Sequence, residues 1–177
     1  MLKKRIIFTF LYSDGIFVQS RNFSLQKVGD IRWLKKNYNF NDISRYIDEL
    51  IILNVSRKKK NLDKFIQDVK IISKFFFIPI TVGGGIKSLS DIERMLKSGA
   101  DKVSLNSAII KDQKFLREAV KNFGSSTITV VIESNKIDNK YFISTSNGRD
   151  LTKIDPVDWA KKVEDLGAGE ILLTSVN

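Results

Sequence analysis

Glycines and small polar residues follow two apolar runs, in a pattern that could bind an anion. Gly83, Gly84 and Gly85 end the run "FIPITV", and Asn106 and Ser107 end the run "DKVSL". Backbone amides without side chains beside them can point at an anion, most often phosphate. If the two runs are neighbouring parallel strands, their carboxyl ends meet at one edge, and the Ser107 hydroxyl joins the amides there. The alternative is a tight strand-to-helix turn without a ligand, and the glycines alone fit both interpretations equally well.

The residue inventory limits the other chemistry. The chain contains no histidine and no cysteine, so disulfides and thiol chemistry are excluded, and the commonest acid–base and metal-binding side chain is missing. Any proton transfer must use Asp, Glu, Lys, Tyr or a bound group. We expect neither a metal site nor a cofactor.

Apolar, strand-like runs alternate with helix-like stretches along the chain. Strands are predicted at 5–12, 49–55, 77–82, 101–106, 127–134 and 170–177. Helices are predicted at 62–75, 88–99, 112–124 and 155–169, and a small hairpin at 140–146. This alternation with short connections predicts an α/β fold of about six parallel strands with the helices outside.

Two arrangements of these strands are open: a doubly wound sheet, or part of a (β/α) barrel. No G-x-G-x-x-G motif follows the first strand, which weakens the nucleotide-binding version of the sheet. The length of 177 residues favours one domain, 1–177. The stretch 13–48 is long for one connection, and we expect a mobile, lid-like loop followed by a helix there.

The charge of the chain has three possible interpretations. The formal net charge is +10 in an otherwise ordinary globular composition. It could serve a nucleic-acid surface or a site for phosphorylated small molecules, or reflect lysines scattered over solvated faces. Only "SRKKKN" (56–61) is a dense basic cluster, and it lacks the interleaved aromatic residues of a single-strand binder. We therefore do not expect nucleic acid as a partner.

Neither a membrane nor a secretory destination is indicated. No apolar run reaches the length of a membrane span. The N-terminal "MLKKRIIFTFLY" has a basic start and an apolar stretch, but no small-residue cleavage site follows it. We predict a cytoplasmic protein.

Several stretches together resemble a known family. "FIPITVGGGIKSLSDIERMLKSGADKVSLNSA" and "DPVDWAKKVEDLGAGEILLTSVN" are similar to the HisF-type cyclase subunit of imidazole glycerol phosphate synthase, and the likeness covers nearly the whole chain apart from 31–47. The resemblance implies a phosphate-binding (β/α)8 barrel. Such a subunit takes ammonia from a HisH-type glutaminase docked at its amino-terminal face. At the other face it closes the imidazole ring of a phosphorylated histidine precursor.

Two groups of residues carry over from the family. Gly84, Gly85, Asn106 and Ser107 match a phosphate site. A second group matches a ring of charged side chains that lines the partner-facing mouth and gates ammonia: Arg5, Glu49, Lys102 and Glu170. Each stands at the start of a predicted strand, so the four should meet at the bottom of a barrel, where two acids and two bases neutralise each other. A purely structural salt-bridge layer is an equally weighted alternative.

The departures from the family fall on the chemistry. The family uses one aspartate at the end of the first strand and one at the end of the sixth, and Leu11 and Asn177 stand at those positions. Neither side chain can replace a carboxylate in proton transfer. Asn54 and Gln19 replace an expected aspartate and lysine. Glu133 is the one carboxylate expected at the active rim, and it is a weak catalytic candidate.

The match stops at the sixth strand, whereas a closed barrel of this type needs eight strands and about 250 residues. We therefore expect an incomplete barrel, from either a truncated gene product or an open barrel completed by a partner. Three functions follow from the resemblance: a cyclase with impaired or altered chemistry, an ammonia-channelling subunit in the amidination of a surface sugar, or a non-catalytic remnant.

Overall fold

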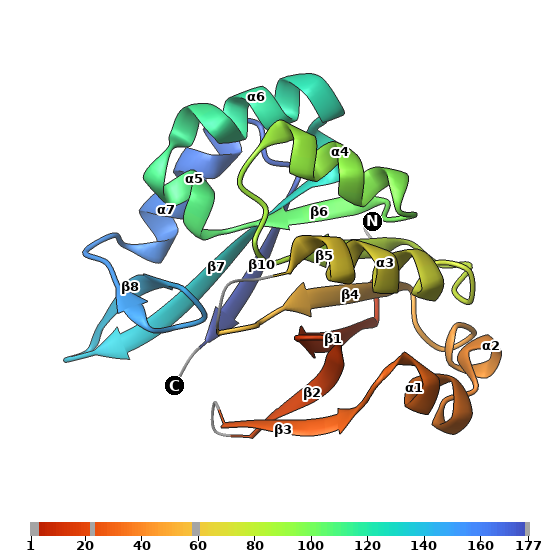
Figure 1. Cartoon of the computed structure of the whole chain (residues 1–177). Helices are drawn as coiled ribbons and strands as arrows, with labels where there is room; N and C mark the ends of the chain where they lie inside the picture. Colours follow the sequence, from red (N-terminus) through yellow and green to blue (C-terminus); the bar gives the residue numbers. More distant parts are fainter. Residues whose placement is uncertain (1–3, 22–23, 58–60, 176–177) are drawn as a thin grey trace. The chain divides into compact units, whose positions relative to one another are not determined.

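The computed structural model describes residues 4–21, 24–57 and 61–175 (Figure 1). The chain divides into two compact units, which are described separately. Unit 1 comprises Met1–Gly85 and Glu93–Lys102, and unit 2 comprises Ile86–Ile92 and Val103–Asn177. That the chain forms a single domain stays a prediction.

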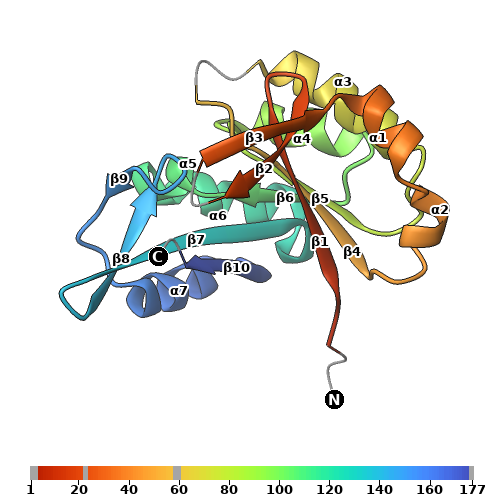
Figure 2. The same ribbon diagram turned by 90° about the horizontal axis from the view of Figure 1, so that it is seen from below.

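Unit 1 contains three parallel strands and an antiparallel hairpin. In spatial order its strands are β3 (Ser24–Gly29), β2 (Ile16–Arg21), β1 (Ile7–Ser13), β4 (Glu49–Asn54) and β5 (Ile80–Gly83). Strands β1, β4 and β5 run parallel, while β2 and β3 pair antiparallel with their neighbours. The β2–β3 hairpin continues from β1 and leads into two short helices, α1 (Ile31–Asn37) and α2 (Phe40–Ile43) (Figure 2).

The core of unit 1 lies between its strands and helix α3 (Leu62–Ile72). The apolar residues of this helix recur at helical spacing, and Phe65, Val69 and Ile72 are buried. The ring of Phe65 lies 4.9 Å from that of Tyr12 on β1, centroid to centroid. Tyr12 therefore points toward α3, and the residues before and after it point to the other face of the sheet.

Unit 2 repeats the alternation of strands and helices. Its strands are β6 (Lys102–Leu105, whose first residue belongs to unit 1), β7 (Ile128–Ile137), β8 (Lys140–Thr145), β9 (Asp150–Leu151) and β10 (Glu170–Ser175). Strands β6 and β10 pair parallel with β7, and β8 turns back antiparallel along it. The helices are α5 (Ser107–Lys111), α6 (Gln113–Phe123) and α7 (Pro156–Asp165), with a 3-10 turn at Ser125–Thr127; α4 (Leu89–Lys97) carries residues of both units.

The predicted fold class is confirmed. The described residues contain six strands in parallel pairings, three in each unit, with helices between them and a hairpin at β8. That set is the α/β pattern of an incomplete (β/α)8 barrel. None of the helices in these described ranges is long and apolar enough to cross a membrane.

Two local expectations were wrong, and one element was not predicted. The stretch 13–48 contains strands β2 and β3 followed by α1 and α2 rather than a loop and one helix. Asp14 and Gly15 both adopt positive φ and form the two-residue turn that pairs β2 antiparallel with β1. The first strand begins at Ile7, so Arg5 precedes it. Residues 107–111, for which no element was predicted, form the short helix α5.

Candidate functional site

A buried carboxylate stands at the amino ends of the parallel strands in unit 1. Glu49, the first residue of β4, is 1% exposed. Its Oε2 lies 3.1 Å from Arg5 Nη1 and 3.0 Å from Lys102 Nζ. Its Oε1 accepts a hydrogen bond of 2.6 Å from the Thr81 hydroxyl. Two cations and a hydroxyl thus compensate the desolvation of this charge.

Three of the four residues predicted to gate ammonia therefore lie together. The fourth, Glu170, is the first residue of β10 in unit 2, where its Oε2 accepts a hydrogen bond of 3.3 Å from the Thr129 hydroxyl. Its place in the ring stays a prediction. Thr81 was missed, although a polar residue near the start of an apolar strand is a signal that could have identified it.

One face of the unit 1 sheet connects this cluster with Leu11. In the parallel register Ile7 is opposite Glu49, and Leu11 is opposite Leu53. Because side chains alternate along a strand, Leu11 and Glu49 project from the same face, and Tyr12 projects from the other. Four residues at about 3.3 Å each separate the two levels by roughly 13 Å. The carboxyl end of this face carries an aliphatic side chain where the resemblance implies an acid.

Three further positions at which the sequence departs from the family are Asn54, Gln19 and Asn177. Asn54 is buried, and its Oδ1 accepts hydrogen bonds from the Ser56 backbone N–H (3.1 Å) and hydroxyl (2.7 Å). It therefore shapes the loop after β4. Gln19 is exposed on β2. Asn177 lies outside the described residues.

The requirement for glycine at position 84 has a cause within the protein. Gly84 and Gly85 both have positive φ, of 96° and 99°. A Cβ atom added to Gly84 would clash with the backbone carbonyl oxygen of Asn54. The close approach at this position is thus made by the main chain next to β4, and phosphate binding by Gly84 and Gly85 stays a prediction.

In unit 2, a turn of the hairpin contacts two of the candidate residues. Ser146 donates its backbone N–H to Ser107 Oγ (3.3 Å), and Gly148 donates its N–H to Glu133 Oε2 (2.9 Å). Ser107 retains its own hydroxyl proton for a ligand. Asn106 Oδ1 is buried and accepts no hydrogen bond within the described part of the chain, so a bound molecule could satisfy it.

A buried polar network that sequence reasoning missed lies on the helix side of the unit 1 sheet. The Tyr12 hydroxyl donates to Asp68 Oδ2 (2.6 Å), and Lys64 Nζ lies 2.8 Å from Asp68 Oδ1. Burial, and then the hydrogen bond to Asp68, raise the pKa of Tyr12 well above its ordinary value. Tyr12 is therefore a neutral donor at physiological pH and stabilises the packing of α3 on β1. The i,i+4 spacing of Lys64 and Asp68 was the available signal.

No cluster suited to a metal ion, with three or more Asp, Glu, His or Cys side chains, occurs among residues 4–21, 24–57 and 61–175. The charged side chains at the amino ends pair with each other, as the contacts of Glu49 show. These contacts provide charge compensation and hydrogen bonding around the Glu49 carboxylate.

Comparisons with known proteins place these features in a family. Residues 5–177 match the family described as "Histidine biosynthesis protein". A relative named imidazole glycerol phosphate synthase subunit HisF, from Campylobacter concisus, is 44% identical over 175 residues, which cover 98% of this chain and 68% of the relative. Proteins of the same name from Staphylococcus epidermidis and an Exiguobacterium species are each 39% identical over 100% of this chain, which corresponds to 70% and 68% of their own lengths. The chain spans about two thirds of the length of the curated relatives that it matches.

Proposed function

We propose, from the premise that the chain belongs to the histidine biosynthesis protein family, that it acts as a cyclase-type subunit of imidazole glycerol phosphate synthase with weakened ring-closing chemistry. The observation that carries the proposal is the buried Glu49 carboxylate, held by Arg5 and Lys102 at the amino ends of the strands. A buried charge with two cations is costly to retain for stability alone, since an apolar replacement is often as stable. Its retention favours a role in passing ammonia.

The face above Glu49 suits an uncharged molecule. Between the levels of Glu49 and Leu11 it carries Thr9 and Ile51. This face offers one hydroxyl and no charged group, which is too little to solvate a cation, so ammonia would travel along it as NH3 while ammonium would be held back. In this proposal Glu49 and its two cations receive ammonia from a glutaminase docked at the amino ends of the strands.

The opposite end of the face accounts for weakened chemistry. Leu11 and Asn177 stand where the family has its two aspartates, and neither can replace a carboxylate in proton transfer. Loss of one acid–base group typically slows a reaction by about 10² to 10⁴-fold, so loss of both should slow it by at least that much. Glu133 of β7 in unit 2, which accepts a hydrogen bond from the Gly148 N–H, is proposed as the remaining catalytic carboxylate. Gly85, Asn106 and Ser107 are proposed to bind a phosphate group of the substrate.

A turnover assay tests this function. Purified chain would be incubated with the phosphorylated precursor and ammonium salts, and imidazole glycerol phosphate would be measured by mass spectrometry. The Campylobacter concisus relative serves as the positive control. We expect product above the no-protein background, at a rate at least about 10²-fold below that of the relative. Absence of product would exclude the cyclase function for this chain.

The replacement of aspartate by Leu11 favours a second candidate, in which the chain only conducts ammonia to an amidotransferase acting on a surface sugar. This candidate needs the Glu49 cluster but no acid at the end of β1. It predicts no imidazole glycerol phosphate, together with accelerated glutamine hydrolysis when a HisH-type glutaminase is mixed with the chain. A gene for a sugar amidotransferase beside that of the chain would support it.

A further inference from the structure

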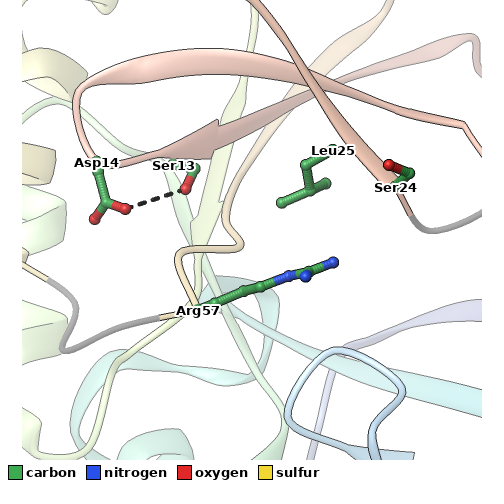
Figure 3. A pocket seen from close by; sticks show the side chains of 5 residues that line it. All are labelled: Ser13, Asp14, Ser24, Leu25 and Arg57. Atoms are coloured by element: carbon green, nitrogen blue, oxygen red, sulfur yellow. Dashed lines mark hydrogen bonds between the residues drawn. The ribbon is translucent and has the colours of Figure 1, made fainter.

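A pocket that none of the predicted site residues lines opens at the carboxyl ends of β1 and β4 in unit 1. Its volume is about 350 Å³, within the range of small-molecule sites. Its lining residues come from the β1–β2 turn, the start of β3 and the loop after β4: Ser13, Asp14, Ser24, Leu25 and Arg57. Figure 3 shows the guanidinium end of Arg57 lying toward Leu25 and Ser24, with Asp14 and Ser13 at the other side of the pocket.

Two of the three segments that line this pocket are tied together by hydrogen bonds. The Asp14 backbone N–H donates to Ser56 Oγ (3.0 Å), and the Ser56 hydroxyl donates to Asn54 Oδ1 (2.7 Å). Val55 donates its N–H to the Tyr12 carbonyl oxygen (2.8 Å). The β1–β2 turn is thereby fixed against the loop that carries Arg57. A pocket with such fixed walls loses little entropy when a ligand binds.

We propose that this pocket binds a phosphorylated polyhydroxy compound through Arg57. A guanidinium presents five N–H donors in a planar fork that matches phosphate oxygens in pairs. The Ser24 hydroxyl can donate to the same ligand, whereas the Ser13 hydroxyl donates to Asp14 Oδ2 (3.4 Å) and can accept from the ligand. Asp14 accepts hydrogen bonds only, so it suits a sugar hydroxyl and disfavours a second anion at its end of the pocket. Leu25 supplies an apolar contact for the carbon skeleton.

This inference deepens the proposed function, on which it rests for the class of ligand. It assigns to Arg57 the recognition of a substrate phosphate at the carboxyl edge of unit 1, separately from Gly85, Asn106 and Ser107. Arg57 begins the basic run of the "SRKKKN" cluster, whose function the sequence left open. Binding of a phosphorylated compound at Arg57 and formation of imidazole glycerol phosphate are measured in separate experiments, so either proposal can fail while the other holds.

The test is a titration of the chain, labelled in its leucine methyl groups, with ribose 5-phosphate. The Leu25 methyl signals report on this pocket and not on other phosphate sites. We expect saturable shifts of these signals, and Arg57→Leu should weaken binding at least about tenfold, since one charge-assisted fork is lost. Arg57→Lys keeps the charge but lacks the paired N–H donors of the guanidinium, so its affinity for ribose 5-phosphate should fall severalfold. Ribose without phosphate should bind far more weakly.

The matched control is Arg117→Leu, which removes one cation from the exposed face of α6 and does not line the pocket. The affinity of this variant for ribose 5-phosphate, measured from the Leu25 signals, should stay within about twofold of the wild-type value. Thermal unfolding of each variant shows that it is folded. Unchanged Leu25 signals at saturating ribose 5-phosphate, or equal affinities of the Arg57 and Arg117 variants, would overturn the inference. If Arg57 binds the probe but no imidazole glycerol phosphate forms, the pocket stands and the proposed function fails.

Discussion

At the scale of single residues, Glu49 is the charged side chain whose ion pairs we expect to contribute most to stability. Its carboxylate is buried between Arg5 and Lys102. In Glu49→Gln the two cations lose their counter-charge, and we expect the free energy of unfolding to fall by about 2 kcal/mol, because both cations are partly exposed and recover some hydration. Glu93→Gln, which breaks only a surface pair with Lys97, should cost less than about 0.5 kcal/mol. Equal losses in urea denaturation would show that the cluster is not electrostatically special.

Gly84 is required by the backbone next to it. In Gly84→Ala the new methyl group meets the Asn54 carbonyl at a φ of 96°, so we expect a loss of about 3 kcal/mol or more in the free energy of unfolding. Gly124 also has a positive φ, of 85°, but nothing lies within 4 Å of a Cβ there. Gly124→Ala should therefore cost only about 1 kcal/mol. If chemical denaturation gave the same value for both, the close approach would not be the cause.

Tyr12 makes a pH-dependent contribution to stability. Its pKa is raised in the folded state by burial and then by Asp68, so the unfolded chain releases this proton first, near pH 10 or about its ordinary pKa. The contribution is complete below that pH and is lost as the pH rises above it. We expect the wild-type protein to lose more stability than Tyr12→Phe between about pH 9 and about pH 11. Urea denaturation across this range tests it, with the exposed Tyr46 changed to Phe as the control; parallel pH profiles of wild type and Tyr12→Phe would refute it.

At the scale of elements, the β1–β2 turn and the loop after β4 behave as one structure because Ser56 joins them. Ser56→Ala removes both of these hydrogen bonds from a buried site, and we expect a loss of about 1–3 kcal/mol in the free energy of unfolding. The affinity for ribose 5-phosphate should fall as well, because the walls beside Arg57 are released. Ser90→Ala, at an exposed position of α4, serves as the control. Unchanged affinity in the Ser56 variant would mean that the pocket needs no such fixation.

The elements also show what sequence patterns can predict. β4 was predicted within one residue of its bounds because its run is continuously apolar, and the start of α7 was predicted from Pro156. Strands β2 and β3 were missed although Asp14–Gly15 is a strong signal for the turn between β1 and β2. Half of the residues of each strand are exposed, and neither strand shows a clear apolar face. The helix α5 was missed because five residues are too few for periodicity.

Site geometry was harder to predict, because contacts between distant residues leave no local pattern. The grouping of Arg5, Glu49 and Lys102 could be expected from their places at strand starts once a parallel sheet was assumed. The hydrogen bond of Thr81 to Glu49 and the pocket at Arg57 depend on rotamers and on the path of loops. Neither periodicity nor spacing encodes these.

At the scale of the whole molecule, the proposed function needs one end of unit 1 to receive ammonia and the other end to perform weakened chemistry. Unit 1 holds both the Glu49 cluster and Leu11, on one sheet face and roughly 13 Å apart along β1. Family membership supports the proposal that the Glu49 end receives ammonia. The leucine at position 11 supports the proposal that the chemistry at the other end is weakened. Restoring an acid at the second end is therefore the change that should most directly restore function.

The decisive measurement is the rate of imidazole glycerol phosphate formation from the phosphorylated precursor and ammonium by wild type and by Leu11→Asp. We expect Leu11→Asp to form product at least about tenfold faster than wild type, because an acid–base group is returned to the end of β1. Thr9→Asp places a carboxylate on the same face two residues earlier and should give no such gain. A Leu11→Asp variant no faster than wild type, or a Thr9→Asp variant that gains equally, would contradict the account.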